Sequence, residues 1–271
     1  MPTRHTDEGP VWRRRSQKEA LLHWAGLLVM AAVVAYCVKL VDAGTNWNFV
    51  ASAGDVARDL GGRMWPPDWT YAANLLEPII DTIHIATLGT VAALALAFPL
   101  AFLAARNTTP STRFVRPVAL LAIVVSRSVN SVIWALILVY LVGPGMLAGI
   151  VAIALRSVGF CTKLLYEELE EIDPDTVEAM EATGASTPQV LNYGIVPQIT
   201  PAFAGLSIYR WDINIRESTV VGLVGAGGIG MQLQAALESI AWSQVFVIFL
   251  FILATVVVSE WVSAKVRAAV T

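Results

Sequence analysis

Four charged side chains crowd one otherwise apolar stretch of the chain, residues 199–224. They are Arg210, Asp212, Arg216 and Glu217. At about 100° per residue on a helix, Arg210, Asn214 and Glu217 fall on one face. Asp212 and Arg216 fall on the opposite face, in the i, i+4 order that favours an ion pair. Arginine offers a fixed positive charge to an oxyanion, whereas a carboxylate can carry a proton or act as a general acid or base.

Composition indicates where this stretch lies. Of 271 residues, 56% are hydrophobic and 14% are charged, whereas soluble domains have about 45–50% apolar and about 25% charged residues. The apolar residues also form long blocks without the hydrophilic face that a helix of a soluble protein needs. We therefore expect an all-α integral membrane protein. The net charge of -3 does not favour a nucleic-acid partner, and the three histidines and two cysteines suggest no metal site.

Six apolar blocks are long enough to cross a membrane at about 20 residues each. They cover about residues 20–40, 76–105, 118–142, 146–166, 199–224 and 242–264. The first block is of full length and no small-residue cleavage site follows it, so we expect a retained span rather than a signal peptide. Between the first two spans, Trp47, Trp65 and Trp69 indicate an interfacial loop.

Lysine and arginine in the short connecting segments predict the orientation, because cytoplasmic segments carry an excess of them. With the N-terminus inside, ten of them fall in inner segments, and only Arg58 and Arg63 fall in outer ones. Both termini, and the loop between the fourth and fifth spans, are therefore expected in the cytoplasm.

Charged residues inside spans are costly and mark functional sites. The candidates to line a path for an anion are Arg127, Asn130, Arg210, Asp212, Asn214, Arg216 and Glu217. The alternative is an ion-pair network that fixes helix register, because embedded charges usually pair. Arg156 and Lys163 in the fourth span are expected to snorkel or to face the cytoplasmic end of the bundle.

The loop at residues 167–197 is acidic, although cytoplasmic loops normally favour basic residues. Asp173 predicts a helix start and Gly184 a helix end. A second short helix is expected from Thr187 to about Gly194. Two short acidic helices hinged at a glycine suit docking of a partner protein better than binding of anionic lipid.

This loop resembles the signature loop of bacterial ABC importer permeases: E-A-A, three residues, G, nine residues, I, one residue, L-P. The chain has Glu178, Ala179, Gly184 and Pro197 at that spacing, and departs from the pattern at Met180, Gly194 and Val196. Residues 209–230, with shorter segments at 103–107, 184–186 and 193–198, resemble the permease subunit of phosphonate-type ABC importers. The resemblance covers about residue 75 to the C-terminus.

The resemblance implies a type I importer permease fold over residues 75–271, preceded at 1–74 by a basic tail, a span and a Trp-rich loop. It implies a homodimer in the cytoplasmic membrane that moves phosphonate, phosphite, phosphate or a phosphate ester by alternating access. Its partners would be a dimeric cytoplasmic ATPase, which holds ATP and magnesium, and an extracytoplasmic substrate-binding protein. Residues 167–197 would be the coupling loop, with Glu178, Ala179, Gly184 and Pro197 serving the contact with the ATPase.

A glycine motif follows the fifth expected span: Gly225, Gly227, Gly228 and Gly230 match G-x-G-x-x-G. A dinucleotide site of that type follows a strand and has an acidic residue about 20 residues further on, and neither feature is present in this sequence. We therefore expect close helix packing or a gate at the outer end of the span. The chain also lacks G-x-x-x-x-G-K-[ST], so the ATPase is expected to be another polypeptide, and no residue is expected to be catalytic.

Two rival functions stay open from the residues. An ion-coupled secondary transporter would use Asp212 and Glu217 as carriers, would need no ATP and would be sensitive to uncouplers. An intramembrane enzyme would use one of the same carboxylates as an acid or base, and would turn over in detergent without a partner.

Overall fold

The computed structural model describes residues 3–6, 9–12 and 17–270, and the side chains of residues 18–268. The basic run at Arg13, Arg14 and Arg15 therefore lies outside the described residues. Contacts divide the chain into two units, Met1–Leu60 and Gly61–Thr271.

The first unit begins with a two-stranded antiparallel hairpin, β1 (Thr3–Thr6) and β2 (Gly9–Trp12). Helix α1 (Gln17–Gly44) follows, and its part from Lys18 is long and apolar enough to cross a membrane. Two residues separate α1 from helix α2 (Trp47–Met64), which crosses the boundary between the units at Leu60. The interfacial stretch expected here as a loop is therefore largely helical.

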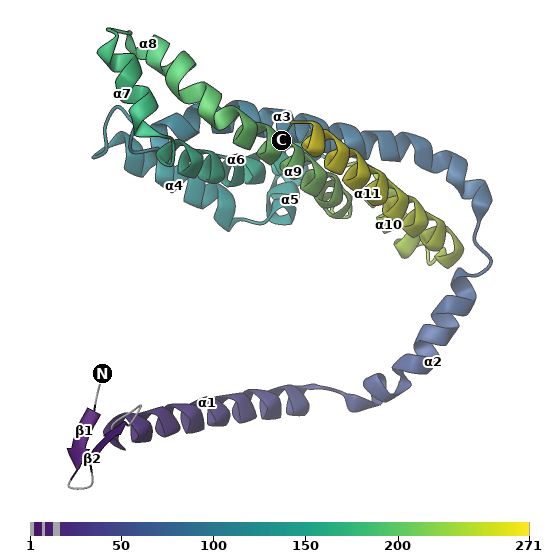
Figure 1. Cartoon of the computed structure of the whole chain (residues 1–271). Coiled ribbons are helices and arrows are strands. Elements are labelled where there is room, and N and C mark those ends of the chain that lie inside the picture. The colour runs from purple at the N-terminus through teal and green to yellow at the C-terminus, as the bar shows by residue number, and fades with distance from the viewer. Residues whose placement is uncertain (1–2, 7–8, 13–16, 271) are drawn as a thin grey trace. The chain divides into compact units, whose positions relative to one another are not determined.

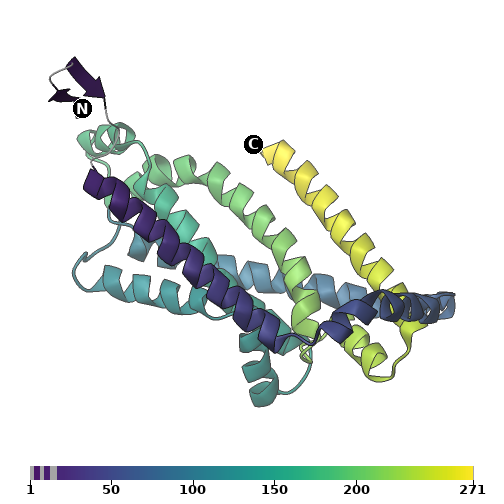
Figure 2. The same ribbon diagram turned by 90° about the horizontal axis from the view of Figure 1, so that it is seen from below.

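The second unit is a set of packed helices (Figure 1). In chain order they are η1 (Trp69–Leu75), α3 (Leu76–Ala104), α4 (Val115–Ser128), α5 (Ser131–Val142), α6 (Met146–Glu170), α7 (Pro174–Ala182), α8 (Thr187–Gln189), the π-helical turn η2 (Val190–Ile195), α9 (Val196–Gly222), α10 (Ile229–Glu238) and α11 (Trp242–Val270). Figures 1 and 2 place α7 and α8 at one end of this unit and α10 at the other.

Within the described residues, length and composition give four or five spans, against the six expected. The four are Lys18–Gly44, Trp69–Ala104, Met146–Glu170 and Trp242–Ala268. The fifth is the pair α4 and α5, which is bent by 88°. Helix α9 occupies the place of the expected span at 199–224 and has 27 residues, but its charged and polar side chains make it less apolar than the others.

The block expected as one span at 118–142 is broken in the middle. Asn130 has an extended backbone, and its side chain accepts a hydrogen bond from the Val132 N–H at 3.0 Å, which starts α5 as a new helix. The two halves have 14 and 12 residues, so each is shorter than the roughly 20 residues that a crossing needs. The expected span is therefore a pair of helices joined at a bend, because a polar cap interrupts the apolar run.

Small residues let the central helices approach one another. Buried Ala86, Gly89, Ala93, Ala97 and Ala101 recur along α3, which packs against α6 and α9. A methyl group at Gly89 would lie 2.9 Å from a side-chain carbon of Ile153 in α6. Close packing of this kind is the main attraction between helices in a membrane, where burial of apolar surface supplies little.

Candidate functional site

A buried charged cluster joins α6 and α9. The Arg210 guanidinium is 3% exposed and its Nη2 lies 3.3 Å from the Glu217 carboxylate. Nε of Arg156, in α6, lies 3.3 Å from the same carboxylate. One carboxylate therefore faces two guanidinium groups, and the cluster of Arg156, Arg210 and Glu217 has a formal charge of +1.

Neutral side chains extend this cluster to α3. Arg210 Nε donates to the Ser157 hydroxyl at 3.0 Å, and that hydroxyl donates to Asn214 Oδ1 at 3.2 Å. Asn214 Nδ2 in turn donates to the Thr90 hydroxyl at 2.8 Å. The Phe160 ring centroid is 5.1 Å from Arg210 Cζ, in cation–π range. Buried polar groups that are paired in this way hold the three helices in one register.

The opposite face of α9 carries a separate ion pair. Asp212 pairs with Arg216 one turn later, as the i, i+4 order predicts, and Asp212 also accepts a hydrogen bond from Ser259 of α11 at 2.9 Å. The Asp212 side chain is 6% exposed, whereas that of Arg216 is 46% exposed. The pair therefore fixes α9 against α11 and leaves one guanidinium accessible at the surface of the unit.

The structure keeps Arg127 and Asn130 apart from the charged cluster. Among the described residues, neither forms a hydrogen bond or ion pair with a side chain of α9. Arg127 lies in the last turn of α4, is exposed, and packs its aliphatic stem beside Gly159 of α6. Asn130 is the cap of α5 described above. The seven candidates for the path thus separate into the buried cluster, the Asp212 pair and the bend between α4 and α5.

The acidic loop is built around α7. The Asp173 carboxylate accepts a hydrogen bond from the Asp175 N–H at 3.1 Å and caps the helix, as expected. Gly184 follows the helix end with φ +79°, a conformation that favours glycine. The four residues named for coupling, Glu178, Ala179, Gly184 and Pro197, are all exposed. A hollow of about 370 Å³ lies between α7 and the segment that follows, lined by Met180, Gly184 and Tyr193 among others.

The second helix of this loop is not short. Helical backbone runs from Thr187 through the π-helical turn η2 into α9. The Val196 N–H bonds to the Leu191 carbonyl, one residue further back than in an α-helix, and the Gln198 side chain donates to the Gly194 carbonyl at 2.7 Å. The expected end at Gly194 is wrong because this wider turn carries the helix past Pro197. Pro197 of the coupling loop, and Arg210 and Glu217 of the charged cluster, therefore lie on one continuous helical stretch.

The glycine motif forms a packed loop between α9 and α10. Gly225, Gly227 and Gly228 have φ of +92°, +89° and +71°. The Gly225 carbonyl accepts a hydrogen bond from the Gly145 N–H at 3.0 Å, at the start of α6. The Ile229 N–H donates to Thr82 of α3 at 2.8 Å. The loop follows a helix instead of a strand and ties three helices together.

Replacing Gly230 by alanine should destabilise the protein by about 1–3 kcal/mol, the usual range for overpacking. A methyl group there would lie 2.1 Å from the Thr219 carbonyl and 2.7 Å from Gly222 Cα, and backbone atoms cannot rotate away. Gly205→Ala is the matched control, because nothing lies within 4 Å of its added methyl. Thermal unfolding in detergent measures both, and equal melting temperatures would contradict the tight packing of this loop.

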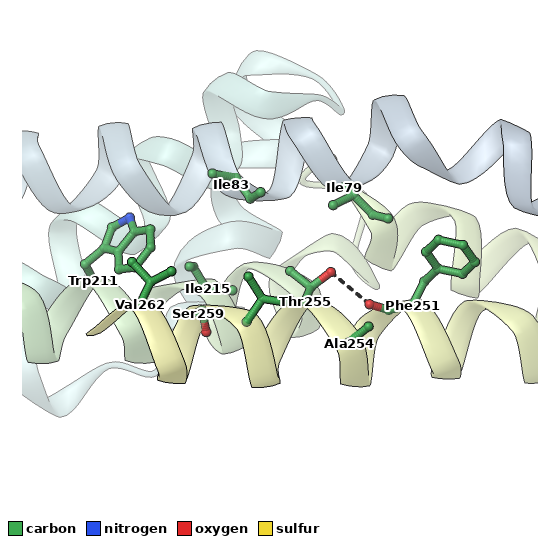
Figure 3. Close-up of a pocket in the computed structure, with 10 residues that line it drawn as sticks. Ile79, Ile83, Trp211, Ile215, Phe251, Ala254, Thr255, Ser259 and Val262 are labelled. Atoms are coloured by element: carbon green, nitrogen blue, oxygen red, sulfur yellow. Dashed lines mark hydrogen bonds between the residues drawn. The ribbon is translucent and has the colours of Figure 1, made fainter. Parts of the chain in front are cut away.

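Figure 3 shows a pocket of about 320 Å³ between α3, α9 and α11. Ile79, Ile83, Trp211, Ile215, Phe251 and Val262 are among its lining residues. Its two hydroxyls are engaged, since Thr255 donates to the Phe251 carbonyl and Ser259 donates to Asp212. This lining suits hydrocarbon and not an oxyanion, so a path for an anion is better sought at the charged cluster.

Sequence reasoning missed three members of the cluster: Arg156, Ser157 and Thr90. Arg156 is expected to snorkel or to face the cytoplasmic end of the bundle, whereas in the structure it pairs with Glu217, 61 positions later in the chain. A charged residue in the middle of an apolar span was a usable signal, because such residues usually pair inside the bundle. The two hydroxyl residues carried no signal, because serine and threonine are common in membrane helices.

Comparisons with known proteins agree with this architecture. Residues 97–270 match the family described as binding-protein-dependent transport system inner membrane component. The phosphite transport system permease protein of Stutzerimonas stutzeri is 38% identical over 93% of this chain and 94% of its own length. The phosphate-import permease protein of Mycolicibacterium smegmatis is 36% identical over 89% of this chain and 45% of its own length.

Among solved structures, the methionine ABC transporter in inward-facing conformations matches 75% of this chain and 99% of its own chain. The TM-score is 0.65 and the identity 18%, which supports the fold alone. The family match covers more than half of the chain, so it places this protein among multi-pass membrane subunits that work with a separate ATPase and a substrate-binding protein and are not enzymes. The chain belongs to the binding-protein-dependent transport system inner membrane component family.

Proposed function

We propose that this chain is the permease through which an ATP-driven importer moves a phosphorus oxyanion: phosphonate, phosphite, phosphate or a phosphate ester. The relatives named for phosphite and phosphate transport support this class of substrate. The observation that carries the proposal is the surplus positive charge of Arg156, Arg210 and Glu217 inside an apolar bundle.

The cluster has the properties that an anion path needs. Glu217 compensates one of the two guanidinium groups, so the positive potential is moderate and an anion can leave again. Ser157 and Asn214 hold Arg210 in place, and Arg156 is 32% exposed and so within reach of a passing solute. Arg127, Asn130, Asp212 and Arg216 lie apart from this cluster, and they are proposed to contribute to the path outside it.

Arginine pairing disfavours the secondary-transporter alternative. A carboxylate that carries a coupling ion must bind and release that ion in each cycle. Asp212 and Glu217 instead each form an ion pair with an arginine, which competes with binding of a coupling ion. The same ion pairs disfavour the use of either carboxylate as the acid or base of an enzyme. Transport by this chain alone, without ATP, would restore the first alternative.

We propose that the assembly is a homodimer with both termini in the cytoplasm, where each copy docks onto one subunit of the ATPase dimer. ATP and magnesium are bound there, on the partner. Glu178, Ala179, Gly184 and Pro197 form the docking segment, and their exposure leaves them free for a partner. The mass of the purified complex tests for two identical copies, and cysteine labelling at the termini tests their side of the membrane.

Arg156→Gln should lower uptake of the anion about fourfold while the complex keeps its normal abundance. The variant removes the surplus charge but leaves Arg210 and Glu217 as a neutral pair. One charge at about 10 Å in an effective dielectric of about 40 contributes about 0.8 kcal/mol, which is about fourfold. The measurement is ATP-dependent uptake of labelled phosphite, phosphonate and phosphate into proteoliposomes that contain the ATPase and the binding protein.

Arg156→Lys is the matched control, because it keeps the charge and should keep most of the uptake. Normal uptake in Arg156→Gln would contradict the path. Loss of folded complex in Arg156→Gln would instead assign the residue a structural role.

A further inference from the structure

Helix α2 is amphipathic. At about 100° per residue, seven of its apolar side chains fall within a sector of about 120°; they are Phe49, Val50, Ala53, Val56, Ala57, Leu60 and Met64. Trp47 and Ala51 lie outside this sector. Asn48, Ser52, Asp55 and Asp59 also lie outside this sector, and Arg63 lies at its edge. None of the residues of α2 is buried, and Phe49 and Val56 are 75% and 61% exposed. Within the described residues of the first unit, nothing therefore covers this apolar side.

The connections of α2 restrict where it can lie. One span ends at Gly44 and the next begins at Trp69, and consecutive spans emerge and re-enter on the same side of a membrane. Helix α2 spans about 26 Å between its ends, whereas the chain from Met64 to Trp69 reaches at most about 17 Å. A helix standing upright on the membrane would carry its far end out of reach of the second span. Helix α2 therefore runs along the membrane surface.

Tryptophan marks both ends of this segment. Trp47 begins α2, Trp65 directly follows it, and Trp69 begins the next span. Their side chains are 55%, 70% and 60% exposed. Tryptophan prefers the boundary between headgroups and acyl chains, so both ends of α2 carry anchors at the depth that its connections require.

We propose that α2 is a lipid-binding anchor that lies in the membrane interface, with its apolar side toward the acyl chains and Asp55 and Asp59 toward water. Its two acidic residues balance Arg58 and Arg63, so it binds neutral lipid through apolar contact and not through charge. The inference rests on the spans flanking α2 and not on the substrate, so it stands or falls independently of the proposed function.

Matched single cysteines at Ala53 and Ser52 test the anchor. The two are neighbours of similar size about 100° apart around α2, with Ala53 at the centre of the apolar sector and Ser52 outside it. The native Cys37 and Cys161 are first replaced by alanine. Each variant is labelled with the fluorophore NBD, assembled with the ATPase, and reconstituted in phosphatidylcholine vesicles. Iodide should quench the label at residue 53 at least about threefold less than at residue 52, and nitroxide lipids should show the reverse order.

A second pair of variants checks that the apolar side causes the effect. Val56→Asp should raise iodide quenching at residue 53 about threefold, and Ser52→Asp, on the polar side, should leave it unchanged. Equal iodide quenching at residues 52 and 53 would overturn the proposal, because α2 would then stand in water. Protection of residue 53 from both quenchers would also overturn it, because α2 would then pack against protein.

Discussion

Gly184→Val should reduce transport at least about tenfold while ATP hydrolysis by the complex continues. Gly184 has φ +79° and links α7 to the helical stretch that leads into α9. A β-branched side chain strongly disfavours this conformation, so the valine variant should change the direction in which the chain leaves α7. Nothing lies within 4 Å of an added Cβ, so the effect comes from the backbone and not from a clash.

Gly184→Asn separates these causes, since asparagine adopts positive φ more readily than other residues. Gly184→Asn should retain most of the transport, although it also adds a side chain at this position. Both variants are compared by anion uptake per ATP hydrolysed in proteoliposomes. Normal coupling in Gly184→Val would show that the turn does not transmit the movement of the ATPase.

Glu217→Gln should reduce the amount and the melting temperature of the folded complex, at a cost of about 3–5 kcal/mol. The substitution leaves Arg156 and Arg210 facing each other without a counter-ion, and Arg210 is 3% exposed. Removing one member of a buried ion pair is costly because the remaining charge stays desolvated. Thermal unfolding in detergent and yield from the membrane measure the loss.

A double variant tests the electrostatic cause. Arg210→Gln with Glu217→Gln leaves only Arg156, which is partly exposed, so stability should recover in large part. Glu238→Gln is the matched control, because the same change at an exposed site should alter stability by less than about 0.5 kcal/mol. No recovery in the double variant would mean that the three side chains do not act as one ion-pair cluster.

Local rules predicted much of this molecule. Asp173 before a proline predicted the start of α7, and Gly184 predicted its end. The i, i+4 order predicted the pairing of Asp212 with Arg216. The apolar blocks gave the positions of the long helices. Each of these features depends on residues within a few positions of one another, which is the range over which a sequence pattern is informative.

Contacts between distant segments could not be predicted in the same way. The sharing of Glu217 by Arg156 and Arg210 depends on how α6 packs on α9, and Asp212 finds Ser259 only because α11 lies alongside. The break at Asn130 shows a different limit. An apolar composition on both sides masked a local cap, so the run looked like one span although its backbone turns by 88°.

The continuous stretch from Thr187 to Gly222 joins the two ends of the second unit mechanically. At about 1.5 Å per residue it is about 50 Å long, with the docking segment at one end, the glycine loop at the other, and Arg210 between them. A rigid rod that tilts about a fixed point moves its ends in opposite directions. If the charged cluster is that pivot, a push on the end near Thr187 reaches the far loop as a lever movement, and α9 need not unwind to deliver it.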